Sequence, residues 1–524
     1  MIKRRAISLS LILILIFSIF GISGCSTTTD FTVYYGIDKM PNNLDPILSD
    51  SFSEILAAKN CFRGLFKIDS NDQVVKDLVK EFKVNEKGTE YTFILNENIW
   101  DNGTPVTAHD FVFALQRAAL PETSSPYISE ISNIKGVSDC LNGVPASIGV
   151  VAENDKILKF TLVKPDPFFL FKLTSPVFLP CNKEFFEKSG GKYGLDTKHI
   201  LTNGNYKVSL WSDEKYIKLK LNTEIETNNA IAEYVVLTES KTGKSNAKRI
   251  KDKEISMATV SGEDYSIVST ENYTIDVKFS KTYALIFNKN KVSAELIEAF
   301  TKSIHREQFA SKLNERFKLA NNIIPEDSII ITNSAKDVLT LPEYKFNYDP
   351  KTARQMYLNA INQKRNTKAP VFKVKYYGGD AEIKDTLNLI ISNWQSNLGV
   401  YISLNSIDSQ TMLMNNINTN DFEIAVVTLS NSVTQILNTF VTDNSDVDYG
   451  INNNEFNASF SELNNADSLE SSVSAANKCI SIISEDPSVF PIISVPTAYI
   501  YDSTLKNVHF SKFDGTVDFS LIYK

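Results

Sequence analysis

The first half of the chain is dominated by short stretches in which apolar and polar residues alternate, a pattern typical of half-buried strands. A segment of helical spacing runs from about Ser53, as its N-cap, to Arg63. A second helix is expected from Thr107 through Arg117, because Thr107 and Asp110 resemble a capping box with Asp in the Glu position. The expected strands are residues 31–36, 90–95, 158–162, 206–210 and 217–221, the last two as an antiparallel pair.

In the second half, helical and strand patterns alternate along the chain. A helical segment over 292–313 is split near 303–306, and a later helix starts at Asp349, its N-cap, and Pro350 and runs to about Ala360. A helix is then expected at 382–396, and strands are expected at 372–376, 400–407, 423–428, 489–493 and 498–501. This βαβ order predicts an α/β lobe with a partly parallel sheet.

The first 24 residues have the pattern of a secretory signal. A basic start precedes an apolar stretch over 7–20, which is shorter than the ~20 residues that a membrane-spanning helix needs. Cys25, which follows Ile22-Ser23-Gly24, resembles the lipidated cysteine of the bacterial lipobox. We expect cleavage of residues 1–24, a lipidated tether over 25–30, and a location on the extracytoplasmic face of the cell membrane. The alternatives are an ordinary signal peptide and an uncleaved anchor.

Composition limits the possible class of protein. The 524 residues are 43% hydrophobic, which suits two to four folded domains and excludes a wholly disordered chain. The formal charge is −8, and removal of a leader with three basic and no acidic residues leaves 51 basic and 62 acidic residues, or −11. That balance argues against a nucleic-acid partner. Cys61, Cys140, Cys181 and Cys479 follow no metal spacing, and their disulfide state is open.

No motif for catalysis or for metal binding stands out. The four histidines show no ligand spacing. Thr242-Gly243-Lys244-Ser245 lacks the first glycine of a P-loop, and Lys241-Thr242-Gly243 lacks the middle element of the serine β-lactam enzymes. We therefore expect no catalytic residue, no metal and no cofactor.

A series of blocks in conserved order resembles bacterial extracellular solute-binding protein family 5, the oligopeptide- and dipeptide-binding receptors of ABC importers. The most recognisable block, Trp100 to Arg117, is similar to the family pattern W-x-(D/N)-G-x-P-V-T-A-x-D-F-V-x-x-x-x-R. The other blocks are Leu44–Pro46 with Cys61–Leu65, Ser124–Tyr127, Leu201–Tyr206, Ala299–Glu307, Tyr348–Ala353 and Trp394–Val400.

The resemblance implies a two-lobed α/β clamshell of the periplasmic-binding-protein type, class II, with an inserted third subdomain. Lobe I would combine 31–67, 191–281 and 491–524, the insertion would span 68–190, and lobe II would span 282–490. Ligand would bind between the lobes of a monomer, which would deliver it to a permease and its ATPase subunits. Such a receptor works by shifting an open–closed equilibrium and catalyses nothing.

The resemblance also implies two ligand-binding segments. Asp50, Ser51 and Phe52 match a loop that lies against bound peptide backbone, and Tyr127 matches a tyrosine of the cleft. The second segment is Ser430, Asn431 and Ser432, where peptide receptors carry an aspartate for the ligand's ammonium group. This sequence has no acid between Thr428 and Thr434, and Val426 stands where the family has an arginine; Asp443 and Asp446 are the nearest downstream acids.

Three hypotheses about function remain. The first is an importer-linked receptor for peptides or for a related non-peptide solute. The second is a degenerate family member that acts in signalling or adhesion, and the third, disfavoured by the absent motifs, is an extracytoplasmic hydrolase.

Overall fold

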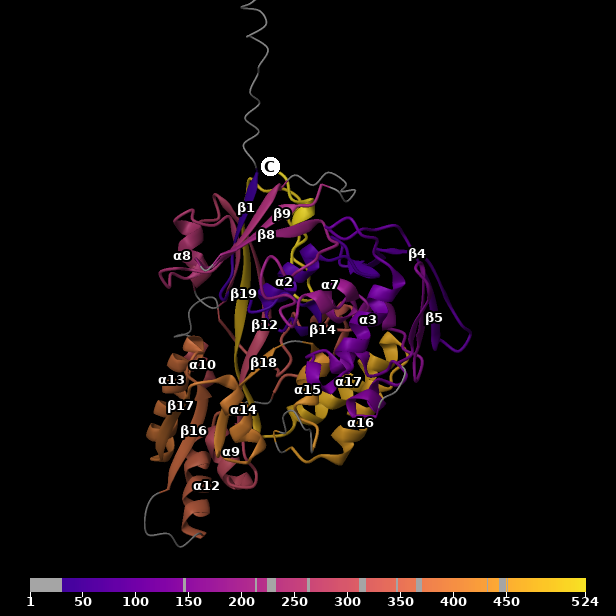
Figure 1. Ribbon diagram of the computed structural model, residues 1–524. Coiled ribbons are helices and arrows are strands. Elements are labelled where there is room, and N and C mark those ends of the chain that lie inside the picture. The colour runs from indigo at the N-terminus through magenta and orange to yellow at the C-terminus, as the bar shows by residue number, and fades with distance from the viewer. Residues whose placement is uncertain are drawn as a thin grey trace, which may run out of the picture.

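Two lobes stacked along a pair of long strands make up the molecule (Figure 1). The long strands are β12 (Tyr273–Phe287) and β19 (Val489–Asp502), which pair antiparallel and run through both lobes. We call the body around β1 lobe I and the body around β16 lobe II. The computed structural model describes residues 31–144, 148–212, 214–223, 232–261, 264–310, 317–344, 347–363, 370–430, 432–442, 449 and 451–524.

An 11-stranded sheet forms the backbone of both lobes, in the order β17-β16-β18-β12-β19-β11-β1-β10-β9-β8, with β13 paired to β19. The predicted antiparallel pair of β8 and β9 is confirmed, and the chain's first strand is confirmed as β1. The remaining strands of this sheet are β1 (Thr32–Gly36), β8 (Tyr206–Ser212), β9 (Tyr216–Leu221), β10 (Tyr234–Thr238), β11 (Met257–Ser261), β13 (Lys318–Leu319), β16 (Val371–Tyr377), β17 (Tyr401–Ile407) and β18 (Ile424–Ser430).

The first helix of lobe I, α2 (Phe52–Cys61), begins two residues earlier than its sequence pattern predicts. Its N-cap is Ser51 rather than Ser53, because only Ser51 has a glutamate three residues later that can complete a capping box. The Ser51 hydroxyl accepts from the Glu54 amide, and the Glu54 carboxylate accepts from the Ser51 amide. Another short helix of lobe I, α8 (Asn246–Lys251), packs beside β11.

Between β2 (Phe66–Ile68) and β8 lies a region with its own four-stranded antiparallel sheet, in the order β4-β5-β7-β6. Its main helix, α3 (Ala108–Ala118), starts as predicted, and the Thr107 amide donates to Asp110 Oδ2 at 2.8 Å. The other elements are β3 (Val74–Lys76), β4 (Val79–Val84), β5 (Glu90–Leu95), β6 (Val150–Asn154), β7 (Ile157–Thr161), α4 (Ile128–Ile131), α5 (Val137–Leu141), α6 (Phe169–Lys172) and α7 (Lys183–Lys188).

Lobe II is the predicted α/β lobe. The parallel strands β16 and β17 are joined by α13 (Ala381–Leu398), which confirms the βαβ order. Separate apolar cores pack on the two faces of the sheet, one with α13 and the other with the last two helices of the lobe. The remaining elements are α9 (Ala294–Lys302), α10 (Arg306–Ala310), α11 (Ala335–Val338), α12 (Pro350–Gln363), α14 (Gln410–Asn418), α15 (Val433–Asn438), α16 (Asn454–Asn464), α17 (Leu469–Ser484), β14 (Ile329–Ile330) and β15 (Asn333–Ser334).

The two late strands predicted from the sequence are a single strand, β19. Pro496 lies in the gap between the two predicted strands and Pro491 lies inside the first, and neither proline has an N–H to donate to a sheet. The structure accommodates both prolines by shifting the register of β12, once between Tyr283 and Ala284 and once between Lys278 and Lys281. The second shift lies where the strands pass from lobe I to lobe II.

Two further features of the described part of the chain are its cysteine thiols and the apolar character of its helices. Cys61, Cys140, Cys181 and Cys479 are all free thiols. Among the residues that the structure describes, no helix has the length and apolar character to cross a membrane. The first 30 residues, with the expected leader, Cys25 and the tether, lie outside the described residues.

Candidate functional site

The junction of the two lobes is formed by the central parts of β12 and β19. Thr282 of β12 and Ser494 of β19 are hydrogen-bonded through their hydroxyls at 3.2 Å. Lys281 lies opposite Ser430, the last residue of β18, so the end of β18 reaches the junction. Side chains at this junction can therefore contact both lobes.

The first predicted binding segment is a tightly hydrogen-bonded turn. The Glu54 carboxylate accepts from the amides of Asp50 and Ser51 at 3.1 and 3.2 Å. The Ser51 side chain caps α2, and Phe52 packs on Tyr35 with the ring centroids 6.1 Å apart. Asp50 is the exposed member; partial burial, with the nearby Glu54 charge, raises the pKa of its carboxyl. Asp50 therefore has the most accessible side chain of the three residues for contact with a ligand.

Tyr127, in the 68–190 region, lies beside this turn and is buried in the apolar core that this region shares with lobe I. Its hydroxyl donates to the carbonyl oxygen of Ser49 at 2.5 Å. Burial, followed by nearby carboxylates, raises the pKa of this hydroxyl well above its ordinary value, so it stays a donor. The structure therefore brings Tyr127 and the Asp50 turn together. The hydrogen bond from Tyr127 to Ser49 stabilises the backbone that leads into the turn.

The second predicted binding segment lies at the end of β18. Ser432 caps α15, and its hydroxyl accepts from the Gln435 amide at 3.3 Å. Ser430 and Ser432 therefore flank the point where β18 turns into α15. Asn431, Asp443 and Asp446 lie outside the described residues.

An acid that sequence reasoning missed lies close to this segment. Asp380 Oδ2 accepts from the Thr428 hydroxyl at 3.2 Å. Strands β16 and β18 pair in parallel, so the residues that follow β16, including Asp380, lie at the same sheet edge as the end of β18. Asp380 is also the N-cap residue of α13, where the helix dipole favours the anionic carboxylate. No local signal marks it, because it precedes Thr428 by 48 residues.

Three carboxylates surround Tyr499 of β19 near the junction. Burial, and after it the charges of Asp514, Asp276 and Asp327, raise the pKa of Tyr499 to about 12. Burial opposes ionisation of Asp514, but its ion pair with Lys59 and its bonds from Thr516 outweigh burial and hold its pKa below the usual range. Each of the three carboxylates also has a lysine partner: Lys59 for Asp514, Lys278 for Asp276 and Lys336 for Asp327.

The two lobes also touch away from the long strands. Lys164 Nζ, just after β7, donates to Asn465 Oδ1 at 2.5 Å and to the Asn464 carbonyl oxygen at 3.4 Å. Asn464 is the last residue of α16, so the β4–β7 region contacts lobe II directly (Figure 1). The contact is made by exposed groups, which can separate at little cost in free energy.

Comparison with known proteins gives consistent results. The family model described as "Bacterial extracellular solute-binding proteins, family 5 Middle" matches residues 73–450. The chain is 26% identical to the dipeptide-binding protein of Lactococcus lactis subsp. cremoris over 77% of each chain, and 22% identical to the oligopeptide-binding protein OppA of Bacillus subtilis over 97% of each.

Solved structures have the same fold. Listeria monocytogenes OppA bound to peptide superposes with a TM-score of 0.72 at 20% identity, covering 95% of this chain and 99% of the other. The unliganded open form of the periplasmic murein tripeptide-binding protein MppA superposes with a TM-score of 0.71 at 20% identity, covering 94% and 97%. The two-lobed fold expected from the sequence is confirmed.

Proposed function

The chain belongs to the bacterial extracellular solute-binding proteins, family 5, and we propose that it binds peptides between its lobes and delivers them to an ABC permease. The observation that carries this proposal is the family match, which extends over both lobes, together with relatives named as dipeptide- and oligopeptide-binding proteins. The family consists of binding proteins, and in this proposal the chain is a receptor and not an enzyme.

Binding works through closure of one lobe on the other. Lobe I comprises 31–67, 191–281 and 491–524, the insertion 68–190, and lobe II 282–490. The register shift between Lys278 and Lys281 supports a hinge at that place, because a bulge bends a strand. The ligand stabilises the closed state only by its greater affinity for that state, and the contact of Lys164 with Asn465 then adds to closure.

Both predicted segments take part in ligand binding. Asp50, Ser51 and Phe52 contact the ligand from lobe I, with Tyr127 behind them, and Ser430, Asn431 and Ser432 contact it from lobe II. Asp380 supplies the counter-charge for the ligand's ammonium group, in place of the acid that the 428–434 segment lacks. Its distance to Thr428 and its place at a helix N-terminus support this role. A desolvated ammonium without such a partner costs several kcal/mol.

The test of this function is peptide binding by the full chain, purified in detergent. Native mass spectrometry with a mixed tri- to hexapeptide library should show bound peptide, and the library should raise the melting temperature. A ligand at one hundred times its Kd stabilises by about 2.7 kcal/mol. If no peptide remains bound and the melting temperature does not change, peptide binding is wrong.

Asp380→Asn should weaken binding of a peptide with a free N-terminus about 30- to 4,000-fold, because removal of one charge of a desolvated pair costs about 2–5 kcal/mol. Calorimetry should show no comparable loss for the N-acetylated peptide. Asp385→Asn is the matched control, since Asp385 is an exposed acid on the same helix. Equal losses for both peptides would reject the ammonium contact while leaving peptide binding intact.

The protein acts on the extracytoplasmic face of the cell membrane, as a monomer held by a lipid on Cys25. Relatives that are named periplasmic binding proteins support an extracytoplasmic site, and the lipobox-like Ile22-Ser23-Gly24-Cys25 supports the anchor.

Cys25→Ala should release the protein from the membrane, because a single-site loss of lipidation removes the acyl chains that give stable anchoring. Fractionation of cells with an antibody against the chain measures this. A substitution at Ser26 serves as the control and should leave the protein in the membrane fraction. Retention of the Cys25→Ala variant in membranes would contradict lipid anchoring.

A further inference from the structure

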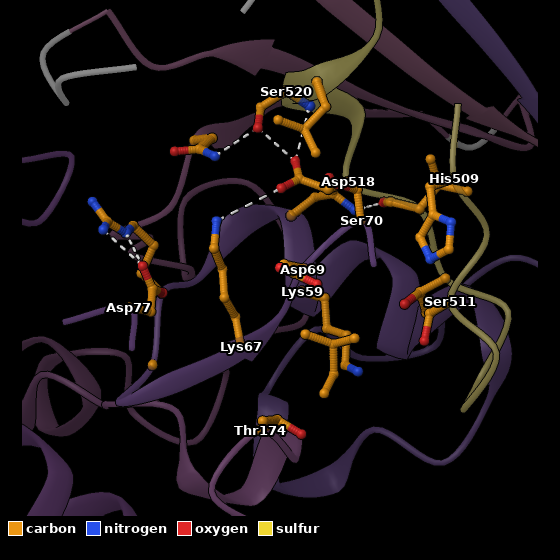
Figure 2. Close-up of a pocket in the computed structure, with 18 of the residues that line it drawn as sticks. Lys59, Lys67, Asp69, Ser70, Asp77, Thr174, His509, Ser511, Asp518 and Ser520 are labelled. Atoms are coloured by element: carbon orange, nitrogen blue, oxygen red, sulfur yellow. Dashed lines mark hydrogen bonds and ion pairs between the residues drawn. The ribbon is translucent and has the colours of Figure 1, made fainter. Parts of the chain in front are cut away.

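A pocket lies between lobe I and the 68–190 region, apart from the junction of the lobes. It has a volume of about 410 Å³, within the range of small-molecule sites, and its lining includes none of the predicted ligand-binding residues. Figure 2 shows that its walls come from the end of α2 with β2 and from the C-terminal segment. Asp77, Thr174 and Leu179 of the 68–190 region add a third wall.

Most charges at this pocket already have close partners. Arg63 Nη2 lies 2.7 Å from Asp77 Oδ1, and His509 Nε2 lies 3.0 Å from Asp72 Oδ1. Lys59 is paired with Asp514. The cations Arg63 and Lys59 therefore each have a carboxylate partner, which weakens their attraction for a simple anion.

One ion pair of the pocket is loose. Lys67 Nζ, on β2, is 4.0 Å from Asp518 Oδ2, on the C-terminal segment, and the two side chains are 46% and 35% exposed. This distance is beyond a hydrogen bond. Asp518 Oδ1 accepts from the Ser520 amide and hydroxyl, which fixes the carboxylate and turns Oδ2 towards Lys67. Figure 2 shows Lys67 and Asp518 facing each other at the pocket.

The uncharged lining is divided between polar and apolar groups. Asn205 Nδ2 donates to Ser520 Oγ at 2.8 Å, beside the loose pair. Phe66 and Val517 supply apolar surface. A small ligand that carries one positive and one negative group close together matches this arrangement. Its negative group can face Lys67 while its positive group faces Asp518.

We propose that this pocket is a second binding site, for a small zwitterion such as a free α-amino acid. The ligand carboxylate binds Lys67 Nζ, and the ligand ammonium binds Asp518 Oδ2 and the Asp69 carboxylate. Asp69 also lines the pocket, and its Oδ1 is held by the amides of Asn71 and Gln73 at 2.8 and 2.9 Å. Because the walls come from three distant segments, the bound zwitterion ties the C-terminal segment to the 68–190 region.

The test is calorimetric titration of the full chain in detergent with L-alanine, after the junction has been saturated with a peptide that binds there. One equivalent of L-alanine should bind, whereas N-acetyl-L-alanine, acetate and ethylammonium, which each lack one of the two charges, should bind at least tenfold more weakly. Lys67→Gln and Asp518→Asn should each weaken L-alanine at least tenfold and leave peptide affinity unchanged. Asparagine keeps the oxygen that accepts from Ser520.

Lys83→Gln is the control, since Lys83 is an exposed lysine on β4 outside the pocket. The proposal is overturned if L-alanine gives no heat at 10 mM, if acetate binds as well as L-alanine, or if neither Lys67→Gln nor Asp518→Asn changes its affinity. The outcome is independent of peptide binding: a chain that bound no peptide would still be titrated with L-alanine, and a pocket that bound none would leave the peptide result unchanged.

Discussion

Arg117→Met is expected to lower the free energy of unfolding by about 3–5 kcal/mol, because it leaves the Asp45 carboxylate buried without a counter-charge. Both side chains are buried, and the guanidinium bonds directly to the carboxylate. Arg117 Nη1 also donates to Cys181 Sγ at 3.3 Å, and the guanidinium carbon lies 3.8 Å from the centroid of the Phe186 ring. Burial disfavours the charged guanidinium, but Asp45 outweighs burial and raises the pKa of Arg117 above its ordinary value.

Urea unfolding followed by circular dichroism measures this loss. Lys188→Met is the matched control, because Lys188 pairs with Glu184 on the surface with both side chains more than two thirds exposed, and such pairs contribute about 0–1 kcal/mol. The double variant Asp45→Asn, Arg117→Met should lose less than the sum of the two single variants, since it leaves no unpaired charge. A single-variant loss no larger than that of the control would show that the buried pair does not stabilise the fold.

Trp394→Ala is expected to cost about 3–5 kcal/mol in lobe II, the range for a buried aromatic residue replaced by alanine. Trp394 is 1% exposed, and its ring centroid lies 4.9 Å from that of Phe300. Its Nε1–H donates to the Phe300 carbonyl oxygen at 2.9 Å, so the substitution leaves a cavity and also removes the partner of a buried acceptor.

Urea unfolding measures this loss as well, with two further variants as references. Trp394→Phe keeps most of the volume and should cost clearly less than alanine. Trp211→Ala, at a partly exposed site on the edge strand β8, should cost less than half as much. Trp394 and Arg117 lie in different cores, so their losses should add to within about 0.5 kcal/mol. Equal losses at Trp394 and Trp211 would contradict the packing described for lobe II.

Local signals predicted the elements that local contacts build. The start of α3 followed from Thr107 and Asp110, which are three residues apart, and the βαβ order of lobe II followed from the alternation of patterns over 372–407. The N-cap of α2 was also encoded locally. Ser51 and Glu54 form the pair that the capping-box spacing requires, and Ser53 has no such partner.

Features that depend on distant pairing could not be predicted. The pattern predicted two strands, 489–493 and 498–501, which the structure joins into β19 through register shifts against β12, more than 200 residues away. Asp380 approaches Thr428 only because β16 and β18 pair in parallel. The pocket of Lys67 and Asp518 joins segments from opposite ends of the chain, which no local pattern relates.

The pairing of β12 with β19 has a consequence for how the chain is organised. The two strands are neighbours and antiparallel, so everything from 288 to 488 is, in topological terms, the loop of one β-hairpin. The entropic cost of closing a loop rises only slowly with its length, so a folded cassette can replace a short turn at modest cost. Lobe II is therefore one continuous insertion between two neighbouring strands, whereas lobe I is assembled from chain segments on both sides of that insertion.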